Sequence, residues 1–553
     1  MRKYIPTESV DLCYIDPPFN SKRNYNQIYN NLGGEDRAQA QAFVDTWVWD
    51  EQADLGFTEI LSNDVGRFNS QTIDLIKGIA PVLKKGSLLA YLVSMAIRIT
   101  EVKRVLKQSG TFYLHCDPTA SHYLKILLDA VFVSGGGDYK NEVIWKRTHS
   151  HGGAKRFGPV HDIIFYYTKS SSFTWNPQYT AYSENYEESF FKHYDPDGRR
   201  YRLTILTGSG TRNGSSGKPW QGYDPTNSGR HWAIPGYVRD LIGQTDNVQT
   251  ALDRLAEIGR VIWPKDGNVP SFKQYIDDME GVSLQDVFTD IPPISAAAAE
   301  RLGYPTQKPE ALLERLISAS SNEGDTVLDV YCGCGTTVAV AQRLNRNWIG
   351  VDITYQSISL VLRRLEDQYG KAVVDNVVLD GVPRDMDSAS ALALKRDDRV
   401  RKEFEKWAVL TYTNNRAIIN DKKGGDGGID GIAYFMTAKA DNAKIVFQVK
   451  SGNVGRGDIS KFNNDRVREG AELGFFITLN APTAGMKSEA NAAGTYDHEI
   501  MGRTYPRIQI VTIEELLANK RLDIAMSREV LKKAKSGTNS GQTSMELAAE
   551  FTE

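Results

Sequence analysis

The residues with the clearest capacity for chemistry follow the first buried strand that the sequence predicts. Val10–Ile15 is an apolar run of strand length, and Asp16-Pro17-Pro18-Phe19 comes directly after it. The prolines stiffen the turn and remove two N–H donors, so its polar edge consists of acceptors, the Asp16 carboxylate and the Pro17 carbonyl. Phe19 adds a flat apolar face. Acceptors beside a ring suit a planar amine, which has two N–H donors and a π face.

The amino group of adenine fits this description. Its lone pair is conjugated with the ring, so it is a poor nucleophile until two acceptors hold both N–H bonds and favour an sp³ nitrogen. Catalysis would then rest on positioning and electrostatic preorganisation, and no strong base is needed. Phe19 would stack on a base that has swung out of the duplex. An ordinary Asp-Pro-Pro turn is the alternative, and these four residues alone leave both interpretations open.

A second stretch has the features of a ligand-binding loop. Thr326–Asp329 predicts a strand, and a Gly-x-Gly turn formed by Gly333 and Gly335 leads into a helix predicted at Val338–Leu344. The glycines let the backbone approach a ligand closely. The next predicted strand ends at Asp352, where an acid typically holds ribose hydroxyls.

The spacing of the glycines narrows the choice of ligand. A nicotinamide site calls for Gly-x-Gly-x-x-Gly, which is absent at this turn. A shorter Gly-x-Gly preceded by an acid, here Asp329, suits a ligand with an amino-acid head. S-adenosylmethionine is such a ligand.

Short apolar strands alternate with amphipathic helices around both turns. This pattern indicates an α/β fold with a doubly wound sheet, whose ligand crevice lies at the carboxyl ends of the strands. Residues 87–93 predict a strand or the start of a buried helix, and 20–54 a loop that orders over a ligand. His115 and Asp117 end another predicted strand, at 111–116, and either border the pocket or cap the next helix. Helices are predicted at 64–83, 100–108, 123–132 and 311–320.

Length and composition set the outer limits. A chain of 553 residues is too long for one core, and two to four domains are expected. It has no apolar run long enough to span a bilayer and no signal-peptide core at residue 1, so no membrane partner is expected. The four cysteines favour a reducing compartment. The net charge of −3 means that any nucleic acid must be bound by a local concentration of cations.

Such a concentration occurs within residues 141–300, where periodicity fades and cations alternate with aromatic or polar residues. The examples are Lys146-Arg147, Lys155-Arg156, Arg199-Arg200-Tyr201-Arg202 and Gly229-Arg230-His231-Trp232. These side chains suit phosphates and major-groove base edges. The alternative is a solvated insertion in which they are structural. The position between two halves of a catalytic fold favours a substrate-reading role.

The C-terminal third contains a second candidate site. Asp430 follows a glycine-rich run and precedes a strand predicted at 432–436, and Gln448-x-Lys450 ends the next strand, predicted at 444–449. In a hairpin these groups meet at one edge. A carboxylate with a backbone oxygen would hold Mg²⁺, while Lys450 would steady a hydroxide or the developing phosphorane charge. A glycine-rich hairpin with a solvated lysine is the alternative.

The first 385 residues resemble the β class of amino-methylating DNA methyltransferases. The resemblance rests on Asp16-Pro17-Pro18-Phe19, Thr306-Gln307-Lys308-Pro309 and the segment Asp329–Thr337. It implies a Rossmann-like, circularly permuted fold, with a catalytic half (1–140), an inserted target-recognition region (141–300) and a cofactor half (301–385). It also implies methyl transfer from S-adenosylmethionine to adenine N6 in duplex DNA. Cytosine N4 stays open, although Asp rather than Ser at position 16 favours adenine.

The resemblance assigns roles to single residues. Asp16, Pro17, Pro18 and Phe19 would grip the target base. Lys308 would lie near the methionine carboxylate and Asp352 on the ribose, and the rest of the cofactor site would be Asp329, Cys332, Gly333, Gly335, Thr336 and Thr337. Val330, Tyr331 and Cys334 depart from the family's usual loop, but both glycines and the acid remain, so cofactor binding is expected.

Residues 401–520 resemble the restriction-endonuclease fold of the Mrr type, a PD-(D/E)xK-type α/β nuclease in which Gln-x-Lys replaces Glu-x-Lys. The resemblance implies a nuclease site of Asp430, Gln448 and Lys450, in which Asp430 and Gln448 hold Mg²⁺ with Glu405 as an extra ligand. A non-cleaving DNA clamp is the alternative. Together the domains predict a restriction–modification enzyme of the prokaryotic cytoplasm or nucleoid, a possible homodimer. Residues 386–400 would be a linker and 521–553 a flexible tail.

Overall fold

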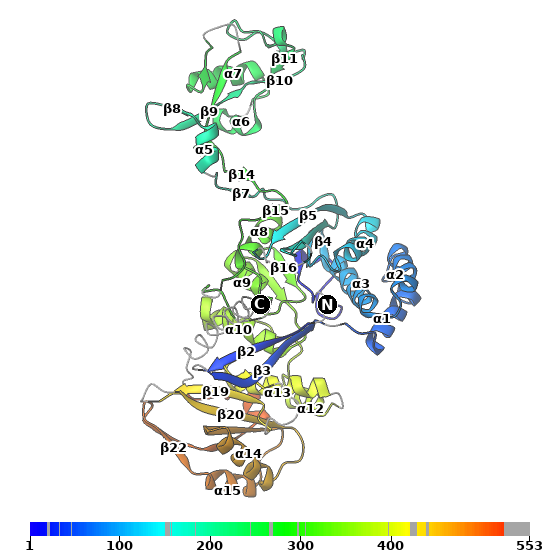
Figure 1. The fold of residues 1–553 in the computed structure, drawn as a ribbon, viewed down its shortest axis with the longest axis vertical. Coiled ribbons are helices and arrows are strands. Elements are labelled where there is room, and N and C mark those ends of the chain that lie inside the picture. The colour runs from blue at the N-terminus through cyan, green and yellow to red at the C-terminus, as the bar shows by residue number, and fades with distance from the viewer. Residues whose placement is uncertain are drawn as a thin grey trace. The chain divides into compact units, whose positions relative to one another are not determined.

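The computed structural model describes most of the chain in two compact units (Figure 1). Unit 1 is Met1–Asn176 with Asp286–Glu553, and unit 2 is Pro177–Gln285. The described residues run from 1 to 524 except 19–22, 32–33, 46, 150–154, 156, 183, 244, 265–268, 296–297, 303, 305, 396–397, 421–427 and 438–441. Phe19, Arg156 and the tail from residue 525 therefore lie outside the described residues.

A seven-stranded sheet organises the first part of unit 1, in the order β15-β5-β6-β4-β1-β16-β17. The strands are β1 (Val10–Ile15), β4 (Leu106–Cys116), β5 (Asp138–Lys146), β6 (His161–Thr168), β15 (Val287–Phe288), β16 (Thr326–Asp329) and β17 (Asn347–Gly350). β1 runs parallel to β4 and β16, and β16 to β17, whereas β6 is antiparallel to β4 and β5. The predicted Rossmann-like fold class is confirmed, with a mixed rather than an all-parallel sheet.

The register at the centre of this sheet aligns the two turns. Cys13 of β1 pairs with Leu328 of β16, so both parallel strands end at the same edge, one in Asp16 and the other in Asp329. Because parallel strands present their carboxyl ends together, segments more than 300 residues apart form one crevice.

Helices cover this sheet: α1 (Glu51–Ser62), α2 (Ser70–Leu83), α3 (Ser87–Val105), α4 (Ser121–Val131), α8 (Glu310–Ser320), α9 (Thr336–Arg343), α10 (Tyr355–Tyr369) and α11 (Lys371–Asp375). Residues 87–93 belong to α3, not to a strand. The apolar run 88–93 lacks the periodicity that separates a strand from a helix, so the sequence left both open. The helix predicted at 100–108 ends at Val105, where β4 begins. The predicted loop at 20–54 was wrong, since it contains β2 (Arg23–Asn31), β3 (Gly34–Asp45) and the start of α1.

Unit 2 is a smaller α/β body. Its four-stranded sheet has the order β12 (Val261–Ile262), β13 (Ser271–Tyr275), β9 (Arg200–Ile205) and β8 (His193–Tyr194). The other elements are β7 (Tyr179–Thr180), α5 (Glu184–Phe190), β10 (Thr207–Ser209), β11 (Arg230–Trp232), α6 (Gly236–Ile242), α7 (Val248–Glu257) and β14 (Val282–Ser283). The unit is shorter than the insertion predicted at 141–300, because β5 and β6 pair into the main sheet of unit 1.

The last part of unit 1 has a five-stranded sheet, β18-β19-β20-β21-β24. Its strands are β18 (Ile418–Ile419), β19 (Gly431–Met436), β20 (Asn442–Lys450), β21 (Ala471–Thr478) and β24 (Ile508–Thr512), and β22 (Thr495–His498) and β23 (Arg503–Pro506) form a separate hairpin. Its helices are α12 (Met386–Ala393), α13 (Asp398–Tyr412), α14 (Arg456–Arg468), α15 (Ala484–Ala492) and α16 (Ile513–Leu517). Ala389 and Ala393 of α12 are buried in this domain's core, so the segment predicted as a linker packs with it. No helix among the described residues has the length and apolar character that crossing a bilayer requires.

Candidate active site

The Asp-Pro-Pro turn and the glycine turn line one cavity of about 1380 Å³. Pockets for a single small ligand measure roughly 300–1,000 Å³, so this space has room for a cofactor together with a nucleoside. The predicted residues that line it are Asp16, Pro17, Pro18, Lys308, Asp329, Cys332, Gly333, Thr336, Thr337 and Asp352. The structure thus brings both predicted halves of the site together.

Lys308 connects the two halves directly. Its ammonium lies 2.5 Å from the Asp16 carboxylate, and its side chain is only 9 % exposed. The resemblance had placed Lys308 near the methionine carboxylate of the cofactor. In the structure Lys308 pairs with the carboxylate that directly follows β1, because the crevice brings the segment before α8 against that turn. Its contact with the methionine carboxylate stays a prediction.

Asp329 anchors the glycine turn. Its carboxylate accepts hydrogen bonds from Tyr331 N at 2.9 Å and Thr337 Oγ1 at 2.6 Å. Burial raises the pKa of Asp329 to about 7, and the negative charges of Asp16 and Asp352 add to this. The site therefore concentrates negative charge where a cationic ligand would be stabilised.

The glycines of this turn have no room for a side chain. Gly333 and Gly335 have φ values of 50° and 74°, in the left-handed region. A Cβ on Gly333 would lie 3.1 Å from the Tyr304 ring, and one on Gly335 would lie 2.7 Å from Val361. Asp352 fixes the turn from the next strand by accepting a hydrogen bond from Gly333 N at 3.0 Å.

These features fit S-adenosylmethionine. Its sulfonium and ammonium groups are cations, and three carboxylates (Asp16, Asp329 and Asp352) line the cavity. Burial raises the pKa of Asp352 as it does that of Asp329, which is the situation that a bound cation would relieve.

A buried chain of hydrogen bonds lies beside the Asp-Pro-Pro turn, and of its members the sequence singled out only His115. The hydroxyl of Tyr14, two residues before Asp16, lies 2.8 Å from His115 Nδ1, and His115 Nε2 lies 3.1 Å from Asp162 Oδ2. His115 is fully buried and sits behind the cavity wall formed by Tyr14. The sequence signal that could have indicated a role for Tyr14 is its spacing of two residues from Asp16, since alternation along a strand places both side chains on one face.

Asp117 stabilises the turn before α4 but does not cap that helix, whose N-cap is Ala120 without a side-chain hydrogen bond. Its carboxylate accepts from the backbone N–H and the hydroxyl of Thr119, both at 3.0 Å. Burial raises its pKa. Asp117 is thus a turn-stabilising acid at the start of the segment that leads into α4.

The second candidate site lies where β19 and β20 pair. Asp430 precedes β19, and its carboxylate accepts a hydrogen bond from Val449 N at 2.8 Å. The side-chain amide of Gln448 donates to the carbonyl of Gly428. Burial raises the pKa of Asp430, the nearby charge of Glu405 raises it further, and Lys402 and Lys450 oppose both effects. The hairpin edge therefore joins the residues predicted there.

The second candidate site offers two carboxylates as possible metal ligands. Among the described residues, no group of three or more His, Cys, Asp or Glu side chains has the arrangement of a metal site. Glu405 and Asp430 are the two carboxylates, and Lys402 Nζ lies between them, 2.7 Å from Glu405 Oε2 and 3.7 Å from Asp430 Oδ1. Two hard oxygen donors suit Mg²⁺, which usually takes its other ligands from water and phosphate.

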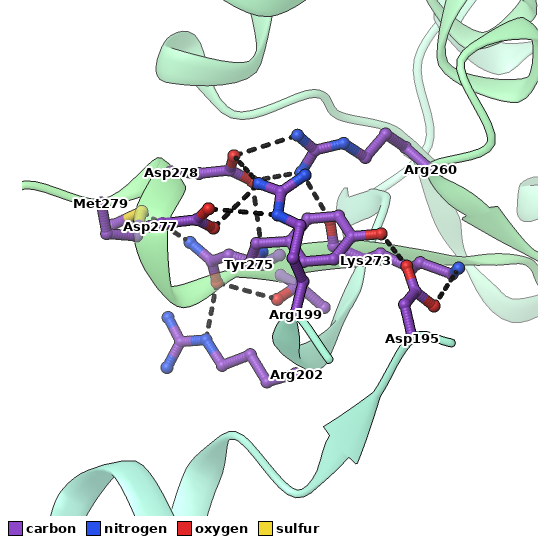
Figure 2. Close-up of polar contacts among 11 residues, drawn as sticks. Asp195, Arg199, Arg202, Arg260, Lys273, Tyr275, Asp277, Asp278 and Met279 are labelled. Atoms are coloured by element: carbon purple, nitrogen blue, oxygen red, sulfur yellow. Dashed lines mark hydrogen bonds and ion pairs between the residues drawn. The ribbon is translucent and has the colours of Figure 1, made fainter. Parts of the chain in front are cut away.

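In unit 2, several predicted DNA-contacting cations have structural partners (Figure 2). Arg199 and Arg260 lie over the Tyr275 ring, at 3.9 and 4.3 Å from its centroid. They also pair with Asp277 and Asp278. Arg202 bonds to Gln274, Arg230 to Thr207, and His231 to the carbonyl of Gly210. Of the predicted cations, Arg199, Arg202, Arg230 and His231 thus have partners within the protein, as the structural alternative expects, and their contact with DNA stays a prediction. Arg260 was not among the predicted cations.

Comparison with known proteins identifies both domains. Residues 10–363 match the DNA methylase family, and the chain belongs to that family. Residues 401–518 match a restriction endonuclease family. Both resemblances seen in the sequence are confirmed.

The matches to curated relatives cover only part of each relative's length. The type II methyltransferase M.EcaI of Enterobacter cloacae is 28% identical over 57% of this chain, which spans 65% of that protein. The DNA adenine methyltransferase YhdJ of Escherichia coli K12 is 49% identical over 14% of this chain and 26% of its own. The chain thus spans less than two thirds of these relatives.

The solved structures share less sequence identity with this chain than these relatives do. The TTHA0409 DNA modification methylase of Thermus thermophilus, complexed with S-adenosyl-L-methionine, is 16% identical. The match covers 69% of this chain and 94% of that one, with a TM-score of 0.30.

Proposed function

We propose that this protein transfers a methyl group from S-adenosylmethionine to the N6 amine of adenine in duplex DNA. The observation that carries the proposal is the single cavity lined by Asp16 and by the glycine turn, with Lys308 linking the two. Membership of the DNA methylase family supports it.

The chain's own residues account for positioning. The Asp16 carboxylate and the Pro17 carbonyl would accept the two N–H bonds of the target amine, and Lys308 would fix the orientation of Asp16. Gly333 and Gly335 would receive the cofactor, with Asp329 near its cationic groups and Asp352 on its ribose. S-adenosylmethionine supplies the methyl group and, as a sulfonium, the leaving group. The proton then leaves the methylated nitrogen, for which Asp16 is the nearest base.

The competing substrate is cytosine N4, whose amine presents the same two N–H donors. The acid at position 16 favours adenine, and so does the adenine-specific relative YhdJ. Single-molecule sequencing of DNA from cells that express the protein distinguishes the two. We expect N6-methyladenine at one recurring sequence, absent with Asp16→Ala. N4-methylcytosine at that site would contradict the choice of base, and no modification would contradict the activity.

We also propose that the C-terminal domain cleaves DNA with Mg²⁺. Asp430 and Glu405 would hold the ion, Gln448 would fix the loop at Gly428, and Lys450 would stabilise the developing charge on phosphorus. The match to a restriction endonuclease family supports this assignment. A non-cleaving DNA clamp is the alternative.

Cleavage of unmethylated plasmid DNA decides between nuclease and clamp. We expect cutting that requires Mg²⁺ and that falls at least a hundredfold with Lys450→Ala, while DNA binding stays within a few-fold. Cutting that persists in Lys450→Ala would exclude this site, and binding without cutting in the unaltered protein would favour the clamp. Duplex DNA is the partner in both cases.

A further inference from the structure

The helix α13 borders both candidate sites of unit 1. Lys402, Glu403 and Lys406 line the cofactor cavity, and the Glu403 carboxylate accepts a hydrogen bond from Tyr355 N at 2.9 Å. Glu405, two residues further along, belongs to the nuclease-like site. Lys402 is common to the two, because it lines the cavity and contacts both Glu405 and Asp430.

The ammonium of Lys402 takes a position that suits a metal ion. It lies 2.7 Å from Glu405 Oε2 and 3.7 Å from Asp430 Oδ1. These two carboxylates carry like charge in a partly buried setting, with side chains 26 % and 16 % exposed, so a cation near both is favoured. Mg²⁺ would bind the same oxygens. Lys402 and the metal ion would therefore compete for them.

Lys402 is also able to leave. Its side chain is 42 % exposed and borders the large cavity, whereas the buried Lys406 is 9 % exposed and pairs with Glu403 at 2.9 Å. An ion pair with such exposure is weakened because water and salt screen it. A divalent ion can therefore displace the ammonium without unfolding its surroundings.

We propose that Lys402 is a built-in counter-cation of the nuclease-like site, which competes with the divalent metal for Glu405 and Asp430. The proposal rests on the metal-binding role proposed for these acids. While the ammonium remains between the carboxylates, it lowers the affinity for metal, and it withdraws toward the cavity when metal binds. The domain therefore binds metal more weakly than its two acids alone would allow.

Calorimetric titration of the full chain with Ca²⁺ tests this, since the readout is affinity rather than cleavage. We expect Lys402→Met to bind Ca²⁺ at least tenfold more tightly than the unaltered protein, and Lys402→Gln to do the same. Lys402→Arg keeps the charge and should remain within about threefold. Lys444→Met removes a lysine that pairs with Glu469 in the same domain, and should leave the affinity unchanged.

The outcomes separate this proposal from the one on which it rests. Equal or weaker Ca²⁺ binding by both Lys402→Met and Lys402→Gln would overturn the role of Lys402 alone. In the Lys402→Met background, Asp430→Asn should abolish the gain. If the gain persists there, or if no variant binds Ca²⁺, the metal site at Asp430 is itself wrong. Thermal melting of each variant verifies that it is folded.

Discussion

The Lys308 ammonium lies 2.5 Å from the carboxylate of Asp16, which is 292 positions earlier in the chain. This ion pair joins the turn proposed to hold the target base to the segment that opens α8. The target base and S-adenosylmethionine would therefore meet beside the ion pair of Lys308 and Asp16.

Asp16 and Lys308 should have separable effects. Asp16→Ala should lower the rate of methyl transfer by at least a thousandfold and leave cofactor affinity within a few-fold, because Asp16 is proposed to contact the base. Lys308→Met should lower both, since Lys308 also lines the cavity near the glycine turn. Calorimetric titration with the cofactor product and a tritium-transfer assay measure the two quantities. Equal loss of affinity in both variants would contradict this division.

Cofactor affinity should depend on pH through Asp329. Burial raises the pKa of Asp329 to about 7, so the carboxylate ionises between pH 6 and 8 and then attracts a cationic ligand more strongly. Affinity should rise by up to about tenfold per pH unit below the pKa and level off above it. Asp329→Asn should bind more weakly and with a flatter profile. An identical profile in that variant would exclude Asp329 as the titrating group.

The same group predicts the direction of a stability change. The folded pKa of Asp329 lies above its unfolded value, so the folded state binds more protons and the free energy of unfolding falls as pH rises from about 4 to 7. Asp329→Asn has no ionisable group at this position and does not show this fall in the free energy of unfolding. The melting temperature of the variant minus that of the unaltered protein should therefore be larger at pH 8 than at pH 5. A difference that does not vary with pH would contradict the burial argument.

Gly335 should tolerate no side chain. In Gly335→Ala the Cβ would lie 2.7 Å from Val361 at a φ of 74°, and the two effects should together cost about 2–4 kcal/mol. Gly381 is a matched control, since its φ is 80° but no atom lies within 4 Å of the added Cβ. Gly381→Ala should cost about 1 kcal/mol. Urea denaturation compares the two, and equal costs would show that close packing at Gly335 is unimportant.

Two arginines of unit 2 should differ in role. Arg260 is 11 % exposed and pairs with Asp278, which is 5 % exposed, so Arg260→Ala should destabilise the protein by about 3–5 kcal/mol. Arg212 is exposed on the loop between β10 and β11. Arg212→Ala should change stability by less than about 0.5 kcal/mol but weaken DNA binding and reduce its salt dependence by about one phosphate contact. Fluorescence anisotropy at several salt concentrations provides the measurement, and unchanged DNA affinity in Arg212→Ala would show that this loop does not contact DNA.

The sequence by itself determined the local elements and the turns between them. Asp16-Pro17-Pro18 lies at the end of β1, and Gly333 and Gly335 lie between β16 and α9, because short-range sterics and hydrophobic periodicity act within a few residues. The pattern did not separate strand from helix in the apolar run at the start of α3, and it was wrong in the β2–β3 segment, whose polar composition resembles that of a loop.

Only the tertiary structure decided which side chains meet. The pairing of Lys308 with Asp16 and of Lys402 with Asp430, and the structural roles of Arg199 and Arg202, depend on strand order and on packing between distant segments. A charged side chain has many possible partners of similar energy in the sequence. The fold selects one of them by bringing it within about 4 Å and excluding water.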